Sequence, residues 1–163
     1  MTRAYIGLGS NLEHPETQLT NALQALAALP STALVTCSSF YRSQPLGPRD
    51  QPFFVNAVAL LETTLAPLDL LDKMLAIERR QGRIRDGRRW RARTLDLDLL
   101  LYGAQRLEQH RLVVPHPEIP RRNFVLCPLA EITHDLHIPG MGRVADLLAE
   151  VGMDGLEKLS KNE

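Results

Sequence analysis

The chain of 163 residues has little of what marks several common protein classes. It has only two cysteines, Cys37 and Cys127, and their spacing fits neither a CxxC pair nor a metal site, which argues for a reducing compartment over a disulfide scaffold. Both are expected to be small core residues. No apolar stretch approaches the length of a membrane span, and no basic segment followed by an apolar one opens the chain. We therefore expect a cytoplasmic protein without a membrane partner.

The chain also has no excess of charge of one sign, because Lys+Arg and Asp+Glu are equal at 19 each. Net charge alone thus favours neither nucleic acid nor an anionic membrane as a partner. The common nucleotide-binding loops are absent as well. There is no GxxxxGK[ST], and "GLGSN" (7 to 11) lacks the third glycine of a dinucleotide fingerprint, so we predict a turn there. Any ATP site must be built from other residues.

The chain does have enough apolar residues, 44%, to bury the core of one domain spanning 1–163, with a polar tail after about residue 152 that is expected to fray. Hydrophobic spacing, turn residues and prolines predict the elements in order. These are a strand at 3–11, a helix from Pro15, strands at 33–43 and 53–64, a helix from Pro67 to near Gly82, a strand at 93–103, and helices at about 124–132 and 143–151. This order predicts an α+β fold, a ferredoxin-like α/β sandwich with helices packed on a mainly antiparallel sheet.

Two aspartates interrupt the apolar run "RTLDLDLLLYG" (93 to 103). Strand alternation places Thr94, Asp96, Asp98 and Leu100 on one face and Leu95, Leu97, Leu99 and Leu101 on the other. The two carboxylates are then about 7 Å apart. A hard cation such as Mg²⁺ would offset their repulsion. The alternative is a solvated sheet face, since D-x-D is a short motif.

Eight arginines lie in residues 79–93, immediately before this strand. They outnumber the nearby acids Asp86, Asp96 and Asp98, and a guanidinium group can bind phosphate oxygens in a bidentate manner. Arginines and Mg²⁺ around one pocket are typical of phosphoryl-type transfer. Ordinary ion pairing is the simpler explanation.

Other polar and aromatic side chains stand out by their position. Asn56 shares a strand face with Phe54, Val58 and Leu60, so its amide is either a satisfied core group or the binding edge for a heterocycle. Trp90, the only tryptophan, lies in the arginine-rich segment and suits either surface cover or stacking and lid closure. The remaining candidates are His116 between two prolines, a surface histidine or a phosphate donor, and Arg121 and Arg122 before a predicted helix N-terminus, which favours anions.

Several ordered segments together give the chain a family resemblance. They are "AYIGLGSN", "SSFYRSQPLGP", "FFVNAVALLET", "IERRQGRIR", "RWRARTLDLDLLLYG", "VPHPEIPRRNFVL" and "PLAEI". With these the chain resembles the 6-hydroxymethyl-7,8-dihydropterin pyrophosphokinases of folate biosynthesis over most of its length. The resemblance implies a kinase-type transferase that moves the β,γ-pyrophosphoryl group of ATP to the pterin hydroxymethyl oxygen and releases AMP.

The resemblance also implies residue roles. Asp96 and Asp98 would hold two Mg²⁺ ions, and Arg83 and Arg93 would be catalytic. The ATP-binding residues would be Glu78, Arg85, Trp90, Leu99, Arg111, Val113, His116 and Arg122. The pterin-binding residues would be Ser43, Gln44, Leu46, Phe54, Asn56, Trp90 and Phe124. Three loops that close over substrate would be Leu12 to Pro15, Pro45 to Gln51 and Arg83 to Arg91. The partners would be small molecules, with no nucleic acid, and the protein a monomer.

The chain departs from the family pattern at two places. Arg91 and Ala92 replace a usual Gly-Pro before Arg93, which alters backbone freedom at the end of the catalytic loop. Val113 replaces a hydroxyl residue of some members. Two other classes compete with this hypothesis: an RNA-binding module, which shares the fold type and arginine-rich loops, and a metal-dependent sugar transferase with D-x-D. Two aspartates on the sheet face argue against the first, and the short chain against the second.

Overall fold

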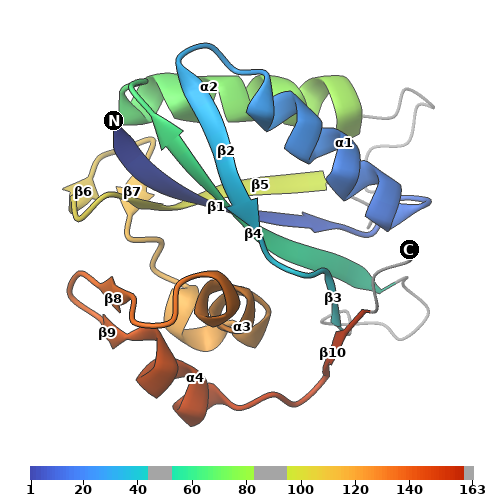
Figure 1. Cartoon of the computed structure of the whole chain (residues 1–163), viewed down its shortest axis with the longest axis vertical. Helices are drawn as coiled ribbons and strands as arrows, with labels where there is room; N and C mark the ends of the chain where they lie inside the picture. Colours follow the sequence, from blue (N-terminus) through green and yellow to red (C-terminus); the bar gives the residue numbers. More distant parts are fainter. Residues whose placement is uncertain (44–52, 83–94, 160–163) are drawn as a thin grey trace.

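Six strands form the main sheet of the computed structural model, which describes residues 1–43, 53–82 and 95–159 (Figure 1). The strands are β1 (Thr2–Ser10), β2 (Thr32–Cys37), β3 (Tyr41–Ser43), β4 (Phe54–Thr63), β5 (Leu95–Tyr102) and β10 (Leu156–Lys158). Their order is β10-β3-β4-β1-β5, with β2 also paired to β4, and every pair is antiparallel. The central pair of β1 and β4, flanked by β5 and β2, is the predicted ferredoxin-like arrangement.

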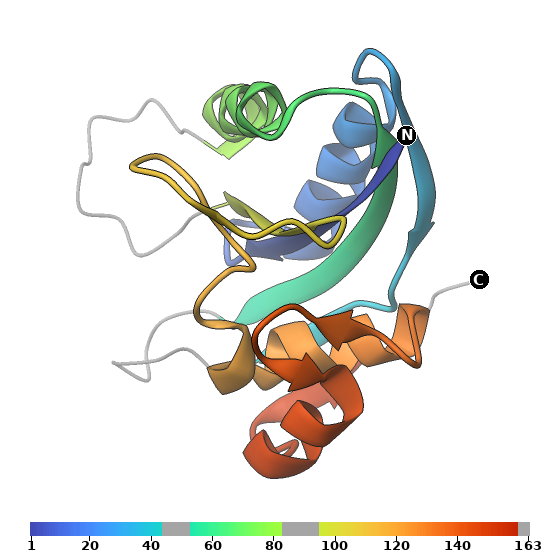
Figure 2. The same ribbon diagram turned by 90° about the vertical axis from the view of Figure 1, so that its left-hand side faces the viewer.

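Helices cover both faces of this sheet (Figures 1 and 2). One face carries α1 (Pro15–Ala27) and α2 (Pro67–Ile77), which begin at the two prolines that predicted them. Their apolar residues bury a core with Ile6, Leu61 and Leu97. The other face carries α3 (Asn123–Ile132) and α4 (Val144–Val151), which pack on a second core that includes Val58 and Leu100. The predicted sandwich is confirmed.

Short elements complete the described chain. A π-helix, η1 (Glu78–Gly82), extends α2, and a 3₁₀ turn, η2 (Ile119–Arg121), precedes α3. Two small hairpins are formed by β6 (Leu107–Glu108) with β7 (Val113–Val114) and by β8 (His137–Ile138) with β9 (Gly142–Arg143). The described ranges contain no helix that is both long and apolar enough to cross a membrane. Both cysteines, which the sequence predicted as small core residues, are half-buried, and Cys37 packs against the first core.

Three local predictions are wrong. The expected turn at "GLGSN" is strand, because β1 continues to Ser10 between β4 and β5. The expected strand at 33–43 is two strands, because the Ser38 side chain accepts the Val58 amide at 3.0 Å and replaces part of the ladder. The tail that was expected to fray contains β10, which pairs with β3.

The expected alternation along β5 fails at Leu101. The register with β1 shifts between Tyr5 and Ile6, so that Tyr5 faces Leu101 and Ile6 faces Leu99. This β-bulge leaves Leu100 as an extra residue and turns both Leu100 and Leu101 to the second core. The residues before the bulge keep the predicted alternation, and Leu95, Leu97 and Leu99 all lie in the first core.

Candidate active site

Two glycines of β1 separate Asn56 from the two aspartates of β5. Gly9 pairs with Asn56 on one side and Asp96 on the other, and Gly7 pairs with Val58 and Asp98 in the same way. Directly paired residues point to the same face of a sheet. The amide and both carboxylates therefore lie on the face that α3 and α4 cover, with a strip of β1 main chain between them. The strip is narrow, because a Cβ at Gly9 would lie 2.9 Å from Oδ1 of Asn56.

Asp98 has positively charged and titratable neighbours. Nη1 of Arg122 lies 3.9 Å from Oδ2 of Asp98, and the two side chains are 36% and 43% exposed. Burial lowers the pKa of His116, although the negative charge of Asp98 partly offsets this. Nδ1 of His116 accepts the Glu118 amide at 3.1 Å, so the neutral ring carries its proton on Nε2. Arg122 and neutral His116 thus place hydrogen-bond donors beside the carboxylate.

Glu78 contacts the backbone between the two aspartates. Its Oε2 accepts the Leu97 amide at 2.6 Å, which ties the start of η1 to β5. Burial raises the pKa of Glu78; the Leu97 hydrogen bond opposes this, and the charges of Asp96 and Asp98 raise the pKa further. In this structure the carboxylate predicted to line the nucleotide pocket holds the strand that carries the aspartates.

A second group of predicted residues lies on the other side of the glycine strip. Nδ2 of Asn56 donates to Oγ of Ser43 at 2.8 Å, and both residues are buried. Ser43 pairs with Phe54 across β3 and β4. Phe124, on the first turn of α3, is half-buried, and Cζ of Arg122 lies 5.8 Å from the centroid of the Phe124 ring. An amide edge and two aromatic rings are groups that can bind a planar heterocycle.

The structure describes three further predicted residues, which lie on other elements than Asp98, Asn56 and Phe124 or on the opposite face of β5. Arg111 forms an exposed ion pair with Asp72 of α2. Val113 is 41% exposed on β7. Leu99 is buried in the first core, on the face opposite the aspartates, so its side chain does not reach the sheet face that carries them. Of the three predicted loops, only 12–15 is described, and there the Leu12 amide donates to Oγ of Ser10 at 3.1 Å.

Several predicted residues lie outside the described ranges. They are Gln44, Leu46, Arg83, Arg85, Trp90 and Arg93, together with the departures at Arg91 and Ala92 and the predicted loops 45–51 and 83–91. Their roles stay predictions. The sequence in turn missed Gly7 and Gly9, whose signal was glycine inside an apolar strand, a pattern that marks close approach of another group.

The two carboxylates suit a cation whose remaining ligands come from a bound substrate. Among residues 1–43, 53–82 and 95–159, no group of three or more His, Cys, Asp or Glu side chains forms a metal-binding cluster. Asp96 is exposed and Asp98 partly exposed, and they occupy alternate positions on one face of the strand. Mg²⁺ is commonly bound by one or two carboxylates with the remaining ligands from water and substrate phosphates. The donor set therefore suits a magnesium-bound polyphosphate better than a closed protein metal site.

Sequence comparisons agree with this set of side chains at the site. The sequence profile of the family described as 7,8-dihydro-6-hydroxymethylpterin-pyrophosphokinase (HPPK) matches residues 5–134. The 2-amino-4-hydroxy-6-hydroxymethyldihydropteridine pyrophosphokinase of Pseudomonas aeruginosa is 54% identical over 157 residues, which cover 96% of both chains. The protein of the same name in Haemophilus influenzae is 51% identical over 160 residues, covering 98% of this chain and 99% of the relative.

Structural comparisons find the same fold in longer proteins. Two structures of the HPPK-DHPS protein of Plasmodium falciparum match with TM-scores of 0.66 and 0.70 and cover 92% and 91% of this chain. The sequence identity is 13% and 11%, so the likeness concerns the fold alone. The chain spans less than half of those proteins, 43% and 45% of their length.

Proposed function

The chain belongs to the 7,8-dihydro-6-hydroxymethylpterin-pyrophosphokinase family, and from that membership we propose how its residues divide the reaction. The protein is an enzyme of folate biosynthesis that transfers pyrophosphate from ATP to hydroxymethyldihydropterin. The pterin hydroxymethyl oxygen forms a new bond to the β-phosphorus, the bond from the α-phosphate oxygen to that phosphorus breaks, and AMP leaves. The hydroxyl proton is released to solvent in the same exchange.

The phosphate side of the site would be β5 and its neighbours. Asp96 and Asp98 would hold the magnesium, two ions by the family resemblance, and Glu78 keeps their strand in place. Bound magnesium neutralises phosphate charge and orients the attacking oxygen. Arg122 and His116 would donate to phosphate oxygens near Asp98, with Arg111, Arg83, Arg85 and Arg93 contributing further positive charge.

The pterin side would lie across the glycine strip. Asn56 would hydrogen-bond with the heterocycle edge, and the rings of Phe54 and Phe124 would stack on its faces, with Trp90 closing over it. Ser43, together with the neighbouring Gln44 and Leu46, would supply polar groups. Val113 and the backbone of Leu99 would line the nucleotide pocket. The observation that carries this division is the single row from Asn56 through Gly9 to Asp96.

Further properties belong to the same proposal. They are a single domain, a monomeric state in the cytoplasm, and the absence of nucleic-acid partners. The two carboxylates on the sheet face oppose an RNA-binding role, since they would repel a phosphate backbone in the absence of a cation.

Product analysis tests the proposed reaction. The purified protein is incubated with hydroxymethyldihydropterin, ATP and Mg²⁺, and nucleotides are separated by chromatography. We expect AMP and pterin diphosphate in equal amounts and no AMP when Mg²⁺ is chelated. Formation of ADP, or no turnover of the pterin at all, would contradict the proposal.

A further inference from the structure

The segment 152–159, which we call the C-terminal strap, contacts β3 along its free side. Within the strap, β10 pairs Leu156 with Ser43, Glu157 with Arg42 and Lys158 with Tyr41. The Leu159 amide also donates to the Phe40 carbonyl at 2.9 Å. The other neighbour of β3 is β4. The strap therefore completes the pairing of a strand that has only three residues.

The strap is also tied to the beginning of α3. Nδ2 of Asn123 donates to the carbonyl oxygens of Gly152 at 3.1 Å and of Asp154 at 3.0 Å. Asn123 is the first residue of α3, directly before Phe124. Two hydrogen bonds from one amide thus connect the strap to the turn of the helix that carries an aromatic wall of the site.

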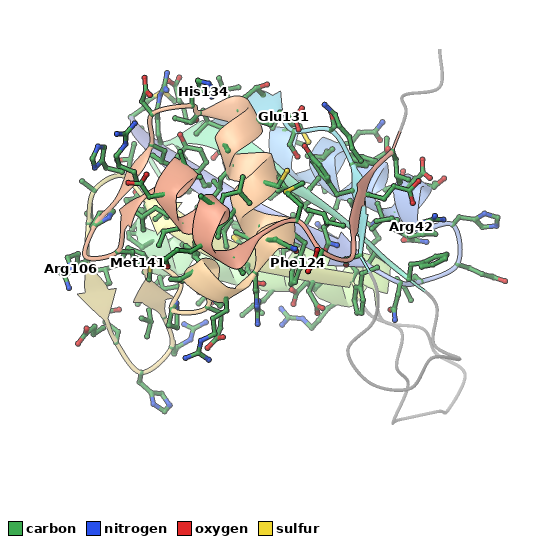
Figure 3. The ribbon with its side chains drawn as sticks, turned by 90° about the horizontal axis from the view of Figure 1, so that it is seen from below. Arg42, Arg106, Phe124, Glu131, His134 and Met141 are labelled. Atoms are coloured by element: carbon green, nitrogen blue, oxygen red, sulfur yellow. The ribbon has the colours of Figure 1, made fainter. Side chains whose placement is uncertain are left out.

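Both attachment points lie on the proposed pterin side. Ser43 accepts the hydrogen bond of Asn56, and Phe124 follows Asn123. The intervening Arg42 forms a 2.6 Å ion pair with Glu157 and lies 4.2 Å from the centroid of the Phe53 ring. In Figure 3, β10 lies between α3 and Arg42. The two aspartates of the phosphate side, in contrast, are positioned by η1 and β5. Arg122 is the phosphate-side residue next to the strap contact, since it directly precedes Asn123.

We propose that the C-terminal strap sets the distance from the hydrogen-bonded pair of Ser43 and Asn56 to Phe124. Asn123 is the positioning residue of the strap. This inference rests on the proposed function, because it assigns a role to the pterin side. Loss of the Asn123 hydrogen bonds would let β3 and the first turn of α3 move apart. Affinity for the pterin would fall, while Asp96 and Asp98, which are held by β5 and its contact with Glu78, would keep their geometry.

Two substitutions separate the hydrogen bonds from side-chain volume. Asn123→Ala removes the amide, whereas Asn123→Asp keeps the shape and turns an acceptor toward two carbonyl oxygens. We expect the pterin KM at saturating ATP to rise about threefold for the first and about tenfold for the second, with the ATP KM changing by less than about threefold. Asn21→Asp, on the exposed surface of α1, adds the same charge and is the matched control.

The outcomes separate this inference from the proposed function. If the wild type makes no AMP, the proposed function fails. If the wild type is active and Asn123→Asp leaves the pterin KM unchanged, or raises both KM values in parallel, only the strap inference fails. A thermal melt verifies that the variants fold.

A second measurement needs no variant. Hydrogen exchange is followed at residues 41–43 and 156–158 of the wild type, with and without the pterin and a non-hydrolysable ATP analogue. We expect both segments to be protected together when the pterin is added. Unchanged exchange in these segments would overturn the inference.

Discussion

Gly9 shows how a missing side chain shapes the site at the scale of one residue. Replacement by alanine would place a Cβ 2.9 Å from Oδ1 of Asn56, closer than packed atoms tolerate. Asn56 must then shift, and its amide loses its place relative to Ser43. We expect Gly9→Ala to lower the free energy of unfolding by about 1–3 kcal/mol and to raise the pterin KM roughly tenfold or more. Chemical denaturation and steady-state kinetics measure the two effects.

Gly7 provides the matched control for this substitution. A Cβ there would lie 3.4 Å from the Leu100 side chain, an ordinary contact distance. Gly7→Ala should therefore be tolerated better than Gly9→Ala in both measurements. Equal effects of the two substitutions would show that Asn56 is not the sensitive group.

Individual residues of the site were predictable to different extents. Asp96, Asp98 and Asn56 stand out in the sequence because a polar side chain in an apolar strand requires a hydrogen-bond partner or a ligand. Gly7 and Gly9 were assigned to a turn because glycine favours turns and close backbone approach alike. Whether the glycines form a turn or a strand is decided by pairing with the neighbouring strands. The local sequence does not contain that information.

Glu131 acts at the scale of elements, because it joins α3 to the segment between β2 and β3 (Figure 3). Its Oε2 accepts the Ser39 amide at 2.9 Å and the Ser39 hydroxyl at 2.8 Å, and its Oε1 accepts the Tyr41 hydroxyl at 2.6 Å. Burial alone would raise the pKa of Glu131, but the hydrogen bonds from Tyr41 and Ser39 outweigh it and lower the pKa. Burial and the bond to Glu131 raise the pKa of Tyr41 well above its usual range.

These directions predict acid sensitivity. Because the pKa of Glu131 is lower in the folded than in the unfolded protein, its ionisation stabilises the fold fully above the unfolded pKa of about 4.5. That stabilisation is lost as the pH falls through the lower, folded pKa. We expect Glu131→Gln to be less stable than wild type at pH 7 and to lose less stability between about pH 5 and pH 3.

Urea denaturation at several pH values measures this difference. Glu150→Gln, at an exposed position of α4, is the control for removing one carboxylate. An acid-induced loss of stability that is identical in wild type and Glu131→Gln would exclude Glu131 as the sensitive group.

Elements with strong local signals were predicted, and those that depend on tertiary partners were not. Pro15 and Pro67 mark helix starts by their fixed φ, whatever surrounds them. The bulge at Leu100 and the strand β10 depend on the register of β1 and on the presence of β3. Neither leaves a clear period in its own segment.

At the scale of the molecule, substrate and metal should stabilise the fold together. Ligand at about a hundred times its Kd adds about 2.7 kcal/mol to the free energy of unfolding. For a domain of this size we expect ATP with Mg²⁺ to raise Tm by roughly 5–10 °C. Asp98→Ala should abolish turnover and most of this shift, since it removes a proposed metal ligand. A fluorescence melt with and without EDTA measures it.

The proposed metal role has a clear contrary outcome. If ATP raises the Tm of Asp98→Ala by the wild-type amount, and the shift still requires Mg²⁺, then Asp98 does not hold the metal. Asp146→Ala, at an exposed position of α4, is the control for loss of a carboxylate outside the site.

The sandwich of helices on a mainly antiparallel sheet was predictable, because strand order and connection rules leave few arrangements of two helices and four principal strands. The separation of the site into a pterin side and a phosphate side was not predictable. It requires the register of three strands at once, with Asn56, Gly9 and Asp96 in one row.

The contact between Glu78 and Leu97 also matters for solubility. β5 ends the sheet, so its outward amides are a template on which a strand of another molecule could align. The Leu97 amide is already occupied by Glu78, and η1 lies against that border of the sheet. A protein that must keep two aspartates accessible on its last strand has thereby blocked one attachment point for edge-to-edge aggregation.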